Sequence, residues 1–211
     1  MKLRTPFSIP APTSEIDRLK KQTHPPNKQR DVQNSETKPI TLLFDLETTP
    51  LSQEDVELHC LVTLDYETGE TTRYNDTGTG LPISRGVTYL MTADTIIGHN
   101  IIGFDIPMIK KVYPFFEPKG RVIDTLLLSR LYHPDMLEVD RKAKIDGMPP
   151  KLYGRHSLES YGHRLGEYKG NFGQTADWSA WSKEMEDYCE QDVIVTNKLC
   201  QHFHPYLTGY N

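Results

Sequence analysis

Acidic side chains at strand spacing are the first features of this sequence that could do chemistry. Asp45 and Glu47 lie two residues apart, directly after the apolar run 42–44. Because side chains alternate along a strand, both carboxylates are expected on one face of a sheet. Two-metal hydrolysis of a phosphodiester needs several carboxylates around cations about 4 Å apart. The pair could supply half of such a site, whereas Asp65 and Glu67, with the same spacing, fall in a predicted turn and are interpreted as solvated surface.

Two further groups of polar residues could complete that site. Asn100, Phe104 and Asp105 follow a predicted strand and open a predicted helix, so Asp105 is either a helix-capping acid or a catalytic one. Tyr188 and Asp192 are four residues apart in the last predicted helix, which puts both side chains on one helical face. A buried core tyrosine is the alternative there, and neither group indicates a function alone.

The elements that must position these residues follow from hydrophobic periodicity and turn signals. A strand over 40–47 is followed by a hairpin, with strands at 58–66 and 71–74 and a turn between them. Strands and helices then alternate, which predicts an α/β protein with a mixed sheet flanked by helices. The expected strands are 95–98 and 122–123, and the expected helices are 84–91, 104–113, 124–132, 157–165 and 182–202.

The remaining stretches carry two more expectations. Residues 134–156 are rich in Pro, Gly, Lys and Arg and are predicted to form a long loop. Asp124 begins a predicted helix, where the role of N-cap is favoured over a catalytic one.

Composition indicates one globular domain preceded by a basic arm. The 211-residue chain is 36% hydrophobic and 25% charged, and no apolar run approaches the roughly 18 residues of a membrane span. We therefore expect a soluble, cytoplasmic protein with no membrane partner. Residues 1–39 hold eight of the 24 basic and four of the 29 acidic residues, a net charge of +4. The predicted domain, 40–211, is left with a net charge of −9, so it needs local basic groups or metal ions to bind a polyanion.

Cysteine and histidine usage suggests no thiolate metal site. Cys60, Cys189 and Cys200 form no closely spaced pair and are interpreted as small buried apolar side chains. Four histidines also lack the spacing of a metal cage and are interpreted as structural or surface residues: His99, His133, His156 and His163.

Taken together and in order, the three motifs resemble those of the DnaQ-like (DEDD) 3′–5′ exonuclease superfamily. They are Asp-x-Glu on a strand, Asn-x-x-x-Phe-Asp after a later strand and Tyr-x-x-x-Asp near the carboxyl end. The tyrosine places the resemblance in the DEDDy branch. Segments 123–131 and 156–166 are also similar to the amino-terminal proofreading domain of T-seven-type bacteriophage family A DNA polymerases. The resemblance covers about residues 41–199.

The resemblance implies an RNase H-like fold and a 3′–5′ exodeoxyribonuclease that releases nucleoside 5′-monophosphates from single-stranded DNA 3′ ends. Asp45, Glu47, Asp105 and Asp192 would hold two Mg²⁺ or Mn²⁺ ions. Tyr188 would orient the attacking water. If a phage encodes the protein, it would act in the host cytoplasm.

The substrate strand is expected to meet residues around these motifs. Asn100 and Phe104 would shape the slot for the last bases, with Thr48 beside them, although structural support is an equally good interpretation. The basic residues of the predicted loop, Lys151 and Arg155 among them, are candidates for phosphate contacts. A solvated mobile loop is the alternative.

The expected biological setting leaves alternatives open. The sequence ends about ten residues after its last predicted helix, so no polymerase domain is expected. A separately encoded proofreading exonuclease, joined to a polymerase subunit through the basic arm, is favoured over an independent enzyme that trims RNA or degrades DNA. A catalytically silent module that binds 3′ ends or a partner is a third possibility, disfavoured because all four acids and the tyrosine are present.

Overall fold

The computed structural model describes residues 38–50, 55–78, 80–167 and 177–208. Five strands form one sheet, in the order β3-β2-β1-β4-β5. The predicted arm lies outside the described residues, except for positions 38 and 39. The strands are β1 (Thr41–Thr48), β2 (Leu58–Asp65), β3 (Thr71–Tyr74), β4 (Thr95–Gly98) and β5 (Arg121–Asp124).

Mixed strand directions confirm the predicted fold class. β1 pairs antiparallel with β2, and β2 pairs antiparallel with β3, as the expected hairpin requires. β4 runs parallel to β1 and to β5, because helical crossovers connect these strands. The central strand β1 therefore has one antiparallel and one parallel neighbour, and its last residues lie at the edge where the following motifs converge.

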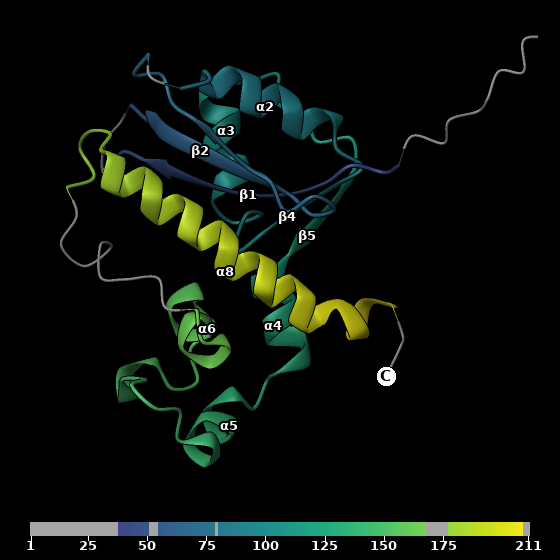
Figure 1. Cartoon of the computed structure of the whole chain (residues 1–211), viewed down its shortest axis with the longest axis vertical. Coiled ribbons are helices and arrows are strands. Elements are labelled where there is room, and N and C mark those ends of the chain that lie inside the picture. The colour runs from purple at the N-terminus through teal and green to yellow at the C-terminus, as the bar shows by residue number, and fades with distance from the viewer. Residues whose placement is uncertain (1–37, 51–54, 79, 168–176, 209–211) are drawn as a thin grey trace, which may run out of the picture. The chain divides into compact units, whose positions relative to one another are not determined.

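Helices cover both faces of this sheet (Figure 1). On one face, α2 (Ile83–Thr92) and α3 (Asp105–Val112) pack on the even-numbered side chains Leu42, Phe44 and Leu46 of β1. On the other face, α8 (Lys183–Thr208) packs against Leu43, on the side that also carries Asp45 and Glu47. The alternation along β1 thus places its apolar side chains against α2 and α3, and its acids toward α8.

A third group of helices packs on the carboxyl-terminal half of α8. It comprises α4 (Thr125–Tyr132), α5 (Met136–Ala143) and α6 (Leu158–Leu165), with a short 3₁₀ turn, η1 (Pro150–Leu152). Met136, Tyr161 and Phe203 share one buried cluster. Within the described part of the chain, no helix is both long and apolar enough to cross a membrane.

Two predicted boundaries were wrong. Residues 134–156 are not one long loop, because α5 and η1 lie within them. The last helix does not end at residue 202 but continues through Pro205 to Thr208, because Phe203 is buried and the rings of Tyr132 and Tyr206 lie 4.7 Å apart. Packing on α4 therefore stabilises a last turn that helix propensity alone does not favour.

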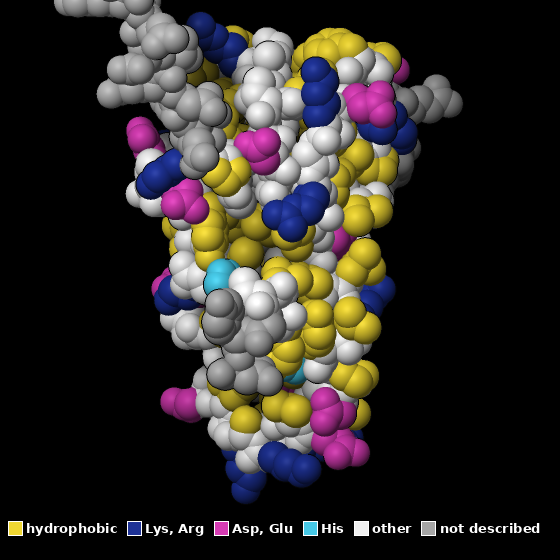
Figure 2. Space-filling view, turned by 90° about the vertical axis from the view of Figure 1, so that its right-hand side faces the viewer, with side chains coloured by type: hydrophobic (Ala, Val, Ile, Leu, Met, Phe, Trp, Pro, Cys, Tyr) yellow, Lys and Arg dark blue, Asp and Glu magenta, His cyan; other side chains and the backbone are white. Residues whose placement is uncertain are grey.

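One surface of α4 is apolar. Figure 2 shows a face of the molecule with many hydrophobic side chains at the surface. Leu127 and Leu131, one helical turn apart on α4, are among the exposed large hydrophobic residues. They occupy a different face of α4 from Leu126 and Arg130, which line the cavity described next.

Candidate active site

Three of the predicted acids line a single open cavity of about 590 Å³. Asp45 reaches it from β1, Asp105 from the first turn of α3 and Asp192 from the middle of α8. These residues are up to 147 positions apart in sequence, so only the fold brings them together. The cavity is also lined by the predicted substrate residues Asn100, Phe104 and Arg155.

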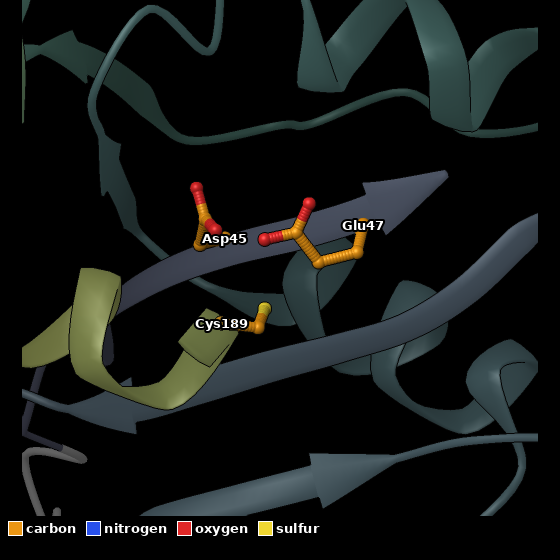
Figure 3. A group of neighbouring side chains, drawn as sticks. All are labelled: Asp45, Glu47 and Cys189. Atoms are coloured by element: carbon orange, nitrogen blue, oxygen red, sulfur yellow. The ribbon is translucent and has the colours of Figure 1, made fainter. Parts of the chain in front are cut away.

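Glu47 lies on the same face of β1 but borders a neighbouring cavity of about 280 Å³. Thr48 and Trp178 line that second cavity, and Phe104 lines both. Carboxylate oxygens of Asp45 and Glu47 and the thiol of Cys189 all lie within 4.8 Å of one another. Figure 3 shows the two acids side by side on β1 with Cys189 of α8 facing them. Both carboxylates therefore lie on one face of the sheet, as their spacing predicted.

Tyr188 lies next to Cys189 on α8, and its ring packs edge-to-face against Trp178 at 6.2 Å between centroids. Because Trp178 lines the second cavity with Glu47, the tyrosine is held at the boundary of the site. Lys151, by contrast, is exposed in η1 and lies outside both cavities.

The turn that carries Asn100 is fixed by Asp124. The Asp124 carboxylate accepts hydrogen bonds from the backbone N–H groups of Asn100 (2.9 Å), Ile102 (3.1 Å) and Leu126 (2.9 Å). The predicted N-cap role of Asp124 is thereby confirmed. Asn100 has φ +64°, a left-handed conformation that asparagine tolerates better than most residues. The short turn delivers Phe104 and Asp105 to the cavity wall.

Helix α8 is anchored to the sheet on both sides of Tyr188. Arg73 of β3 forms ion pairs with Asp187 and Glu190. Glu186 accepts a hydrogen bond of 2.8 Å from the side-chain amide of Asn75. Exposed parts of this network add little stability individually. Together they fix the rotation of the helix, so Asp192 points into the cavity.

Burial makes Asp105 an unusual acid. Its side chain is 3% exposed, and Oδ1 has no hydrogen-bond partner among the described residues. Burial, followed by the charges of Asp124 and Asp192, raises the pKa of Asp105 to about 7, although the backbone N–H groups of Asp105 and Leu46 oppose the shift. An ionised carboxylate in such a place needs a compensating cation.

A divalent cation fits this set of donors. Mg²⁺ and Mn²⁺ prefer carboxylate oxygens, which Asp45, Asp105 and Asp192 bring to one cavity. Cys189 does not suit a hard cation, because burial raises the pKa of its thiol well above the usual range and keeps it protonated. All three cysteines are buried and free, as predicted.

Proton competition gives a direct test of this site. A cation that binds Asp105 displaces its proton, so we expect Mn²⁺ to bind about tenfold more weakly for each pH unit below 7. The increase in Tm at a fixed Mn²⁺ concentration should therefore be larger at pH 8 than at pH 6. Scanning fluorimetry measures it, with Asp105→Asn as the variant that loses the pH dependence; equal increments for the wild type at both pH values would contradict the assignment.

The same raised pKa affects the metal-free protein. Between the unfolded value of about 4 and the folded value, the folded state keeps a proton that the unfolded state has lost. The stability contributed by protonated Asp105 is present below about pH 4 and is lost as the pH rises through about 7.

Several residues that line the two cavities were not selected from the sequence as site residues. Arg130 and His156 line the larger cavity and Trp178 the smaller one. His99 also lines the larger cavity, and the interpretation of both histidines as structural or surface residues stays a prediction. Only the place of His156 at the start of the resembling segment 156–166 drew attention to that residue.

Comparison with known proteins finds sequence relatives of the chain. No protein-family model matches the chain. The DNA-directed DNA polymerase of Escherichia phage T7 is 30% identical over 182 residues, and that of Enterobacteria phage T3 is 31% identical over the same length. Each alignment covers 76% of this chain and 26% of the polymerase. The chain is homologous to one part of these phage polymerases. It spans about a quarter of their length.

Solved structures show the same fold at low sequence identity. Brucella melitensis NrnC superposes with a TM-score of 0.57 and 18% identity, over 82% of this chain and 76% of that chain. The Escherichia coli ExoI–ssDNA complex superposes with a TM-score of 0.51 and 16% identity, over 82% of this chain and 42% of that chain. The mixed five-stranded sheet flanked by helices is thus the predicted RNase H-like fold, and the resemblance to DnaQ-like exonucleases is confirmed at the level of the fold.

Proposed function

We propose that the chain is a two-metal 3′–5′ exodeoxyribonuclease that removes nucleotides from the 3′ end of single-stranded DNA. The observation that carries the proposal is the convergence of Asp45, Asp105 and Asp192 on one cavity of an exonuclease-like fold. Homology to phage DNA polymerases supports DNA as the substrate. ExoI, which shares the fold, was solved as a complex with single-stranded DNA.

The acids would hold the cations, and other residues would place the substrate. Asp45, Glu47, Asp105 and Asp192 are the proposed metal ligands. Divalent ions bound there would stabilise negative charge on both the attacking and the leaving oxygen. The Tyr188 hydroxyl would orient the attacking water for in-line approach.

Two cavities that share Phe104 suggest how the strand is placed. The terminal nucleotide would occupy the smaller cavity, beside Thr48, Glu47 and the ring of Phe104. The preceding nucleotide would lie in the larger cavity, near Asn100 and the basic side chain of Arg155. The scissile phosphate would then lie next to the carboxylates.

The experiment is shortening of a 5′-labelled single strand by the full chain, with Mg²⁺ or with EDTA. We expect a ladder that shortens from the 3′ end only when Mg²⁺ is present, with nucleoside 5′-monophosphates as products. A matched RNA strand should be cut more slowly. Complete inactivity would favour the silent module, and equal cutting of RNA would favour an independent trimming enzyme.

We also propose a separately encoded DNA polymerase as the partner, since the curated relatives carry this region within a polypeptide about four times longer. Co-purification with a polymerase from the native host tests the partnership. Recovery of the exonuclease without any polymerase would reject it.

A further inference from the structure

The segment that carries Arg155 and His156 is held rigidly at the edge of the larger cavity. Asp140 of α5 accepts hydrogen bonds from Arg164 of α6 at 2.9 and 2.7 Å, and one from the backbone N–H of Gly154 at 2.7 Å. Arg164 also donates to the carbonyl of Arg155 at 2.8 Å. The side chains of Asp140 and Arg164 are only 1% and 8% exposed. His156 is therefore presented to the cavity by a fixed backbone.

A chain of hydrogen bonds then orients the His156 ring. Oγ of Ser129, a fully buried residue of α4, lies 2.5 Å from Nδ1 of His156. The same Oγ lies 2.5 Å from the hydroxyl of Tyr161, which is 2% exposed. Ser129 thus links a buried phenol to a histidine of the cavity wall.

Counting the hydrogen-bond donors in the series Tyr161, Ser129 and His156 fixes the tautomer of His156. Ser129 has one hydroxyl hydrogen, and no described residue other than Ser129 offers Tyr161 a hydrogen-bond acceptor. If Ser129 donated to Tyr161, the buried phenol would be left without an acceptor, which costs about 1–3 kcal/mol. Tyr161 therefore donates to Ser129. Among the described residues, Nδ1 is then the one acceptor that the Ser129 hydroxyl can reach, so Ser129 donates to Nδ1. The ring hydrogen of neutral His156 must then be on Nε2.

The surroundings keep this ring neutral. Burial, and then the positive charges of Arg164 and Arg130, lower the pKa of His156, although the negative charge of Asp140 opposes the shift. Among the described residues, Nε2 has no hydrogen-bond partner. His156 therefore carries one N–H donor, and together with Arg130 it lines the cavity that holds Asp45, Asp105 and Asp192.

We propose that His156 and Arg130 form a subsite for the substrate backbone, in which Nε2–H of His156 donates to a non-bridging oxygen of the linkage upstream of the scissile one. The inference rests on the proposed function, because that function places the terminal nucleotide beyond Phe104 and the preceding one in this cavity. A phosphate oxygen accepts such a donor strongly. Arg130 supplies the positive charge that the acidic walls lack.

The experiment neutralises one backbone phosphate at a time. Single-stranded DNA carrying one methylphosphonate at the first, second or third linkage from the scissile bond is tested for removal of the terminal nucleotide. For the wild type, we expect kcat/KM to fall about 10- to 100-fold when the linkage next to the scissile one is modified. His156→Ala should show this loss with unmodified DNA and lose little more with the modified strand. His156→Gln, whose amide can replace Nε2–H, should keep most of the activity.

Two controls separate the possible failures. The ¹⁵N NMR spectrum of His156 should show a protonated Nε2, and Ser129→Ala should mix the tautomers while leaving the histidine in place. Equal methylphosphonate penalties in wild type and His156→Ala at every linkage, or a dominant Nδ1–H form, would overturn the subsite. A wild type that shortens no unmodified strand would instead refute the proposed function itself. Comparable Tm values show that the variants are folded.

Discussion

Asp45→Asn should lower metal-dependent release of nucleotides from single-stranded DNA by at least about 10³-fold. The amide keeps the shape of the side chain but removes the charge at the point where β1 meets Asp105 and Asp192. Metal ions supply several kcal/mol of charge stabilisation in the transition state, and each 1.36 kcal/mol is a factor of ten in rate. The measurement is the initial rate of shortening of a 5′-labelled strand at saturating Mg²⁺.

The chain contains a matched control for this substitution. Asp65 precedes Glu67 by two residues, as Asp45 precedes Glu47, but its carboxylate caps a surface turn by accepting from the N–H groups of Glu67 and Thr68. Asp65→Asn should leave the rate within about twofold, because asparagine retains an acceptor. The rate of Tyr188→Phe should lie between the rates of Asp45→Asn and Asp65→Asn, because the loss of one orienting hydrogen bond lowers the rate about 10- to 100-fold. Activity of Asp45→Asn close to that of Asp65→Asn would reject the proposed catalytic centre.

The part of the fold around β1 was predictable because its signals are local. An apolar run that ends in Asp45 and Glu47 defines a strand, and the period of two fixes which side chains share a face. The turn after Asp65 defines the hairpin by its residue types. These rules need no knowledge of distant residues, so the sheet and most helix positions agree with expectation.

Convergence of the acids was predictable only through the resemblance. Asp105 has the same local appearance as a helix-capping acid, and the features that set it apart, its burial and the nearby charge of Asp192, arise only when the other elements fold around it. Spacing alone could not distinguish the two roles. The order of three motifs carried the information that periodicity lacked.

The region 134–156 shows what local reasoning misses. Its charged and glycine-rich composition suggested a solvated loop, yet Asp140 within α5 is 1% exposed. Its partner Arg164 lies 24 residues further along the chain. The same limitation applies to His156, whose orientation depends on Ser129, 27 residues earlier. Burial created by long-range partners has no signature in the local sequence.

The buried pair between Asp140 and Arg164 carries the largest expected effect on stability. Arg164→Met fills similar space but leaves Asp140 charged, buried and without its cation. Breaking a buried ion pair in this way costs about 3–5 kcal/mol, because the remaining charge is uncompensated. For a domain of this size, that loss lowers Tm by roughly 6–20 °C. The free energy of unfolding from urea titration measures it directly.

Two further measurements test whether the uncompensated charge of Asp140 causes the loss of stability in Arg164→Met. The double variant Asp140→Leu with Arg164→Met removes both charges and should be more stable than Arg164→Met alone. Burial on its own would raise the pKa of Asp140, but the hydrogen bonds from Arg164 and Gly154 outweigh it and lower that pKa. The contribution of Asp140 is therefore present above the unfolded pKa of about 4 and is lost as the pH falls through the lower folded value. The difference in the free energy of unfolding between the wild type and Arg164→Met should shrink in acid. If that difference stays constant down to pH 2, or if the double variant is less stable than Arg164→Met, the pair acts through packing and not through charge.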